Sequence, residues 1–236
     1  MQVMKRKLAI LVAFSFVTIF PLIAQKKEDQ RLKDSATVLQ ETLNKNNGLP
    51  TNILNQAKCV LIFPSVKKVA VGIGGSYGRG ALVCRQGSGM KGEWGAPAMY
   101  KLDQGSIGVQ LGSTATDFVL VIMSQKGADQ ILNGKTNFGS NAAAAAGPTG
   151  AQATSYSAAS MNADVLTYSR SKGLFAGVSL EGASMDTDKD ANKRLYGKHM
   201  NAKEIVTTAP APPAAKPLVS LLDQTSPERK QYMSAQ

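Results

Sequence analysis

Apolar residues first recur at helical spacing shortly after residue 30. Leu32, Ala36, Leu39 and Leu43 repeat at intervals of four, three and four residues, which predicts an amphipathic helix from about Gln30 to Asn44. Its polar face mixes acidic and basic side chains, whereas a helix built for a membrane surface is usually more basic. The pattern therefore favours a helix that packs on the body of the domain.

The following pattern changes to that of β-strands. Cys59–Phe63 is a wholly apolar run ended by Pro64, as expected of a buried strand. Val69–Tyr77 and Ser106–Gly112 alternate bulky with very small residues, and Leu174–Gly182 shows a weaker form of this alternation. A strand face that carries only very small side chains allows another backbone to approach it closely. We therefore expect a strongly curved sheet, either barrel-like or a sandwich.

Further elements complete an α+β reading. We expect a short helix from Pro50 to about Lys58 and another over Lys126–Leu132. The remaining strands are expected at Ala81–Arg85, Ala98–Leu102, Asp117–Met123, Ala151–Ser157 and Val165–Tyr168, while the alanine run Asn141–Ala146 is compatible with either helix or strand. The predicted fold class is α+β, with N-terminal helices on a curved, mainly antiparallel, glycine-rich sheet.

The most informative stretch is Ser171–Arg194, where a strand pattern gives way to a helix. Thr187 or Asp188 is placed to cap this helix, and Gly197 is placed to end it. Here "KGLFAGVSLEGA" followed by "KDANKRLYG" resembles the conserved pattern of the SYLF domain, a lipid-binding module. The resemblance continues upstream in "AKCVLIFPSVKKVAVGIGGSYGRGAL" and "DFVLVIMSQKGADQIL", and it covers roughly residues 26–205.

The two ends of the chain differ from its middle. Three basic residues precede the apolar run Leu8–Ala24, which is the pattern of a secretory signal peptide cleaved after Ala24; a retained membrane anchor is the alternative. Thr207–Pro217 is rich in proline and alanine. We therefore expect a signal peptide at residues 1–24, a SYLF-like domain at 25–206, and a linker with a disordered or loosely docked tail at 207–236.

The charge of the chain is unevenly distributed. Without residues 1–24, the 236-residue chain keeps 24 basic against 16 acidic residues. Between Lys58 and Lys101, seven residues are basic and only Glu93 is acidic. This surplus indicates an anionic partner, and in an exported chain without a nucleic-acid-binding motif that partner is anionic lipid rather than nucleic acid. A solvated basic face that only aids solubility is the alternative.

Candidate catalytic and metal-binding patterns are weak. The sequence from Gly74 to Gly78 fits the G-x-S-x-G pattern around Ser76, but a nucleophile elbow needs a helix after the turn, and strand pattern returns at Ala81. His199 is the only histidine. We therefore expect no enzymatic activity, no cofactor and no metal site.

Cys59 and Cys84 both fall on predicted strands. An exported chain meets an oxidising compartment, where a disulfide between them could form. Disulfides prefer strand ends and loops, so the pattern slightly favours two buried thiols.

The resemblance to the SYLF family implies non-enzymatic lipid binding. In eukaryotic members the domain is associated with phosphoinositides and in some with actin. For an exported chain, in a bacterial periplasm or outside the cell and peripheral to a membrane, the expected ligand is anionic phospholipid. The candidate head-group contacts are Lys67, Lys68 and Arg79, with Arg170 and Lys172 behind them. The alternatives are an envelope scaffold with a protein partner bound to its C-terminal tail, and a hydrolase at Ser76.

Overall fold

A computed structural model describes residues 19–44, 48–69, 75–105, 115–140, 142–149, 163–171, 174–177, 180 and 182–227. Within these ranges, the side chains of residues 19–25, 68–69, 75, 104–105 and 174–177 are not described. The predicted strands at Ala151–Ser157 and Ser106–Gly112 lie outside the described residues.

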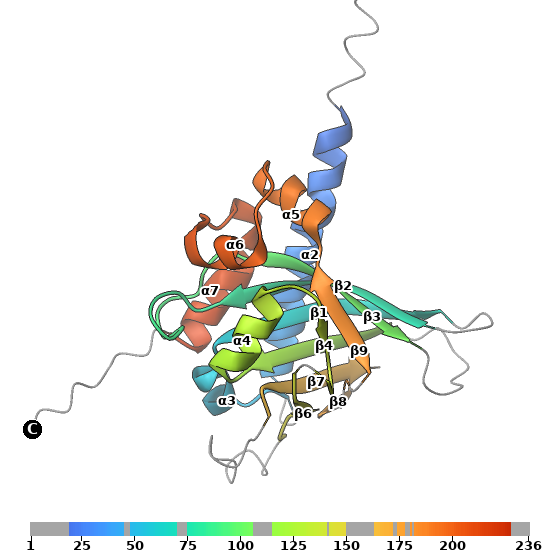
Figure 1. The fold of residues 1–236 in the computed structure, drawn as a ribbon, viewed down its shortest axis with the longest axis vertical. Helices are drawn as coiled ribbons and strands as arrows, with labels where there is room; N and C mark the ends of the chain where they lie inside the picture. The colour runs from blue at the N-terminus through green and yellow to red at the C-terminus, as the bar shows by residue number, and fades with distance from the viewer. Residues whose placement is uncertain are drawn as a thin grey trace, which may run out of the picture.

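The described elements begin with two helices, continue with strands that one helix interrupts, and end with helices (Figure 1). In order they are α2 (Ile19–Leu43), α3 (Thr51–Gln56), β1 (Cys59–Val69), β2 (Gly75–Cys84), β3 (Ala98–Gly105), β4 (Ala115–Ile122), α4 (Gln125–Leu132), β5 (Thr136–Asn137), β6 (Ala144–Ala146), β7 (Val165–Ser171), β8 (Leu174–Gly177), β9 (Ala183–Thr187), α5 (Lys189–Tyr196), α6 (Ala202–Thr208), the 3-10 turn η3 (Pro213–Ala215) and α7 (Lys216–Thr225).

The strands form one curled sheet in the order β5-β9-β3-β2-β1-β4-β7-β6, with β8 also paired to β7. All described pairs are antiparallel except that of β6 with β7. The sheet curls far enough that a bridge between Phe138 and Ala142 links the segments that follow β5 and precede β6. The expected α+β class and curved, mainly antiparallel sheet are confirmed. The alanine run, which the sequence left undecided between helix and strand, contains the strand β6 at residues 144–146.

Both faces of the sheet are covered, which explains the continuous apolar run at the start of β1. Cys59, Leu61 and Phe63 point into a core shared with α4. Val60 and Ile62 point the other way, into a core shared with α2, α3, α5 and α7. Figure 1 shows α4 on one face of the curled sheet and α2 on the other. A strand buried on both sides has no polar face to alternate with the apolar one.

The reversal between β1 and β2 corrects one prediction. Val69–Tyr77 was expected to form one strand, but Val69 pairs with Gly75 across an antiparallel ladder, so the chain must turn between them. The ladder shifts register between Ile62 and Lys67, and Gly80 accommodates the irregular segment. A Cβ on Gly80 would lie 2.1 Å from the carbonyl oxygen of Ile62. Gly80 lies outside the alternating segment Val69–Tyr77, so this close approach of two backbones is a separate finding.

The N-terminal helix α2 is longer than expected. It begins at Ile19 rather than near Gln30, because no helix breaker follows Pro21 and the charged residues after it are good helix formers. Leu32 and Leu39 are fully buried against the sheet, so the prediction of a helix packed on the domain is confirmed. None of the described helices is both long enough and apolar enough to cross a bilayer.

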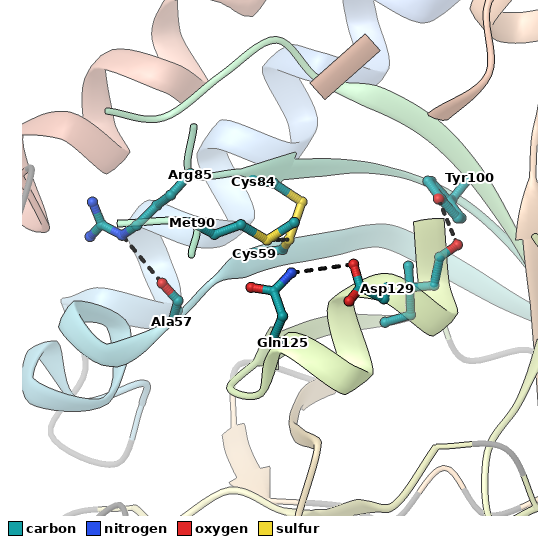
Figure 2. Close-up of a disulfide and its surroundings, with 9 residues drawn as sticks. Ala57, Cys59, Cys84, Arg85, Met90, Tyr100, Gln125 and Asp129 are labelled. Atoms are coloured by element: carbon teal, nitrogen blue, oxygen red, sulfur yellow. Dashed lines mark hydrogen bonds between the residues drawn. A yellow bond between two sulfur atoms is a disulfide. The ribbon is translucent and has the colours of Figure 1, made fainter. Parts of the chain in front are cut away.

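The preference for two free thiols is wrong. Cys59 on β1 and Cys84 on β2 are direct partners in the ladder and form a disulfide (Figure 2). Met90 Sδ lies 3.9 Å from Cys59 Sγ and covers the bridge. The pairing brings the two strands' ends together, because Cys59 begins β1 and Cys84 ends β2. The sequence placed Cys59 at the start of one predicted strand and Cys84 near the end of another, but local patterns could not show that these two strands pair in this register.

The expectation of a disordered or loosely docked C-terminal tail is also wrong for residues up to Pro227. Leu218 and Leu222 of α7 are fully buried in the core that also contains α2. The buried Arg85 guanidinium holds the end of this helix, donating hydrogen bonds to the Ser226 carbonyl (2.8 Å) and hydroxyl (2.6 Å). The Trp94 indole N–H also donates to the Ser226 carbonyl, at 2.9 Å, and the Arg85 guanidinium stacks over the Trp94 ring. The domain therefore includes α7.

Candidate ligand-binding pocket

A pocket of about 500 Å³ lies where α2 meets the irregular part of the β1–β2 ladder. Its lining comes from two segments far apart in the sequence: Lys27, Gln30, Arg31 and Asp34 from α2, and Pro64, Ser65, Lys67, Tyr77, Gly78 and Arg79 from β1 and β2. Four of these side chains are basic and one is acidic. The surplus of positive charge fits an anionic ligand.

Two guanidinium groups of this pocket share one carboxylate. Arg79 Nη1 lies 2.6 Å from Asp188 Oδ2, and Arg31 Nη1 lies 3.7 Å from the same oxygen. Arg79 Nε donates to the hydroxyl of Tyr77, whose ring is 41% exposed at the pocket. Burial lowers the pKa of Arg31 from its ordinary value, against the opposing effects of Glu28 and Asp188. Burial also opposes ionisation of Arg79, but Asp188 and Tyr77 outweigh it and raise the pKa of Arg79.

The shared carboxylate is fixed by the helix that it caps. Asp188, one of the two predicted capping residues, is the N-cap of α5 and accepts a hydrogen bond of 3.1 Å from the Ala191 N–H. Gly197 ends α5 in the left-handed conformation. A second ion pair joins α5 to α2, since Arg194 Nη2 lies 2.6 Å from Glu28 Oε1. These contacts hold α5 against the N-terminal half of α2, so that Asp188 lies beside Arg31 and Arg79, which line the pocket.

The predicted head-group residues are distributed unevenly. Lys67 and Arg79 both line the pocket. The side chain of Lys68 and the whole of Lys172 lie outside the described residues. Arg170 is placed elsewhere, in ion pairs with Glu41 and with Asp117, whose Oδ2 lies 2.5 Å from Arg170 Nη2.

Sequence reasoning missed the contribution of α2 to the pocket. Lys27 and Arg31 are four residues apart, which places them on one face of the helix. The predicted helix began at Gln30, so this spacing was not taken into account. A longer helix prediction would have joined the two residues and aligned them with Asp34.

The G-x-S-x-G segment lies in a strand and not at a strand-to-helix turn. Ser76 pairs with Lys68 of β1 and with Gln104 of β3. His199 lines a different pocket, between the end of α4 and the start of α6. The described residues therefore do not place these two side chains in a nucleophile elbow.

A comparison with known families adds an independent observation. A family model described as "Ysc84: Las17-binding protein actin regulator" matches residues 103–225, just over half of the chain. The chain belongs to the SYLF, or Ysc84, family. The match ends with the last residue of α7, in agreement with the buried position of that helix in this family member.

Three relatives illustrate the range of the family. The chain is 35% identical over 188 residues to an SH3 domain-containing protein of Schizosaccharomyces pombe, covering 78% of this chain and 43% of that protein. It is 34% identical over 179 residues to Protein YSC84 of Saccharomyces cerevisiae, covering 74% and 37%. It is 30% identical over 199 residues to the human SH3 domain-containing YSC84-like protein 1, covering 81% and 57%. The chain thus spans about half the length of these relatives, two of which are named as SH3 domain-containing proteins.

Proposed function

We propose that this protein is a non-enzymatic lipid-binding protein that associates with membranes containing anionic phospholipid. The observation that carries the proposal is the pocket between α2 and the β1–β2 ladder, with Lys27, Lys67 and Arg79 beside the exposed ring of Tyr77. Cations attract anionic head groups, and tyrosine is enriched at the level of the head groups, where one end of its ring is wet and the other apolar.

The expected strength of this association follows from the number of charges. Each lysine or arginine close to an anionic membrane contributes about 1 kcal/mol, so three such residues give about 3 kcal/mol. That corresponds to weak binding, with a dissociation constant of about 6 mM. Stable attachment therefore requires a further contact, for which Tyr77 and the interior of the pocket are the candidates.

Vesicle co-sedimentation tests the proposal. Lys67→Glu combined with Arg79→Gln should reduce binding to vesicles of phosphatidylglycerol, and raising the salt concentration should weaken the unchanged protein in parallel. Glutamine at position 79 removes the cation without placing a second carboxylate beside Asp188. The matched control, Lys135→Glu with Lys203→Gln, makes the same change in charge outside the pocket and should bind normally. Equal binding to neutral and anionic vesicles would contradict the proposal.

The proposed location is the bacterial cell envelope, because the basic residues and the apolar run that precede Gln25 have the pattern of a secretory signal peptide. Cleavage after Ala24 would leave a new α-amino group two residues before Lys27, close to the pocket. N-terminal sequencing of the protein isolated from cells should begin at Gln25. A sequence that begins at Met1 would indicate an anchored protein instead.

The alternative of a scaffold that captures a protein partner with its tail is less well supported. The apolar residues of that tail, Leu218 and Leu222, are used within the domain itself. Residues 228–236 lie outside the described part of the chain, and any partner contact through them remains a separate hypothesis.

A further inference from the structure

The charges around the pocket are incompletely balanced. Asp188 is the carboxylate nearest to both Arg31 and Arg79 in the described ion pairs, and it also accepts a hydrogen bond as the N-cap of α5. It hydrogen-bonds to Arg79 at 2.6 Å, whereas its distance of 3.7 Å from Arg31 is too long for a hydrogen bond. One carboxylate therefore serves two guanidinium groups, and it serves Arg31 less well.

The other acidic residues described nearby give Arg31 Nη1 no hydrogen bond, although the charge of Glu28 opposes the effect of burial, which lowers the pKa of Arg31. Glu28, which is almost fully buried, directs Oε1 to Arg194, at 2.6 Å from Nη2 and 3.1 Å from Nε. Asp34 accepts a hydrogen bond of 2.8 Å from Gln30 on the exposed side of α2. Among the described residues, the buried Nη1 of Arg31 has no hydrogen-bond partner. A buried cationic donor without a partner is costly unless a ligand supplies one.

We propose that the pocket is a selective site for a phosphomonoester group, with Arg31 as its floor and Lys27, Lys67 and Arg79 at its sides. A phosphomonoester carries a charge of about −1.5 to −2 at neutral pH and offers three terminal oxygens. A phosphodiester carries a single charge and offers only two such oxygens. The inference rests on the proposed function where the phosphomonoester belongs to a lipid, but it holds equally for a soluble phosphorylated compound.

The shape of the site supports this selection. Guanidinium groups bind phosphate through paired N–H donors, and here Arg31 and Arg79 converge on one carboxylate oxygen from two different elements. A volume of about 500 Å³ leaves room for the phosphate and for part of the group that it is attached to. The exposed Tyr77 ring lies at the same pocket and provides an apolar surface for that group.

Soluble head groups give the first test. Calorimetric titration at constant ionic strength compares glycerol 3-phosphate, a monoester, with glycerophosphoglycerol, a diester. We expect the monoester to bind at least about ten-fold more tightly. Arg31→Gln should abolish this preference, and Lys33→Gln, an exposed change on the same helix outside the pocket, should retain it. Arg31→Lys keeps a positive charge at the site and should retain part of the preference for the monoester. This variant replaces Arg31→Gln in the test if Arg31→Gln does not fold.

Vesicles give the second test and separate this inference from the proposed function. Vesicles of phosphatidic acid and of phosphatidylglycerol are matched in total charge. Stronger, Arg31-dependent binding to phosphatidic acid supports a lipid as the source of the phosphomonoester. Selective binding of glycerol 3-phosphate without vesicle binding supports the site and contradicts the proposed lipid function. Equal binding of monoester and diester, in solution and on vesicles, overturns the inference while leaving general anionic-lipid binding intact.

Discussion

Single residues in this protein join segments that are distant in the sequence. Arg85 follows directly after the disulfide residue Cys84 and lies beside the bridge (Figure 2). It is almost fully buried and reaches the carbonyl groups at the end of α7. The carbonyl ends of a helix carry partial negative charge, which a guanidinium group can neutralise while it supplies the missing donors. The Cys59–Cys84 bridge fixes the strand from which Arg85 extends. Cross-linking a loop of this length contributes about 3 kcal/mol to stability in the chain-entropy account.

Replacing Arg85 with methionine should therefore destabilise the domain strongly. The change keeps much of the apolar stem but removes the hydrogen bonds that the guanidinium donates to four carbonyl groups and to the Ser226 hydroxyl, so we expect a loss of about 3 kcal/mol or more in the free energy of unfolding. Ser226→Ala should cost about 1 kcal/mol. Because the two side chains share a hydrogen bond of 2.6 Å, the double variant should lose less than the sum. Urea denaturation of the four proteins measures this.

The control for this cycle is Lys91→Met, an exposed change in the same loop, which should alter stability by less than about 0.5 kcal/mol. Strict additivity of the Arg85 and Ser226 changes would show that the two residues stabilise the domain independently. It would contradict the coupling expected from the hydrogen bond between the Arg85 guanidinium and the Ser226 hydroxyl. A loss of less than about 1 kcal/mol in Arg85→Met itself would contradict the role of Arg85 as the contact that holds α7.

At the scale of elements, the sequence predicts best where one local pattern has only one structural solution. The apolar run after Cys59 indicates a strand buried on both faces, and the Asp188 cap and Gly197 stop define α5. The bulky-and-small alternation from Val69 to Tyr77 has two solutions, a straight strand and a glycine-rich hairpin. Only the ladder between β1 and β2 distinguishes them. The same ladder pairs the two cysteines, so local sequence patterns could not predict their disulfide either.

The helix α7 shows why long-range contacts limit such predictions. A short apolar patch after a proline-rich segment is typical of a tail, and the helical propensity of ten residues is too weak to maintain a helix in water. Its stability comes from burying Leu218 and Leu222 against a core that includes α2. The candidate site was predicted in part for a similar reason. Lys67 and Arg79 could be predicted from the basic segment of the sequence. Arg31 could not, because its place in the pocket depends on where α2 lies relative to the sheet.

In the whole molecule, α2 performs two tasks with different parts of its surface. Leu32 and Leu39 anchor it in the core on one face of the sheet, whereas Lys27 and Arg31 form one side of the pocket. Ion pairs with α5 connect the two parts, since Glu28 binds Arg194 and Arg31 faces Asp188. If the pocket is the membrane-binding surface, stability and binding should depend on different residues of this connected structure.

Two variants should therefore show opposite effects, one on stability alone and the other on vesicle binding alone. Leu39→Ala removes a fully buried side chain and should lower the free energy of unfolding by about 2–5 kcal/mol. The protein that remains folded should bind anionic vesicles normally, because Leu39 does not line the pocket. Lys67→Glu should change stability by less than about 0.5 kcal/mol, since Lys67 is exposed, but it should weaken vesicle binding. Urea denaturation and co-sedimentation below the unfolding transition measure both quantities. A Leu39→Ala protein that is folded by circular dichroism but no longer binds vesicles would mean that the apolar face of α2 leaves the core and enters the membrane.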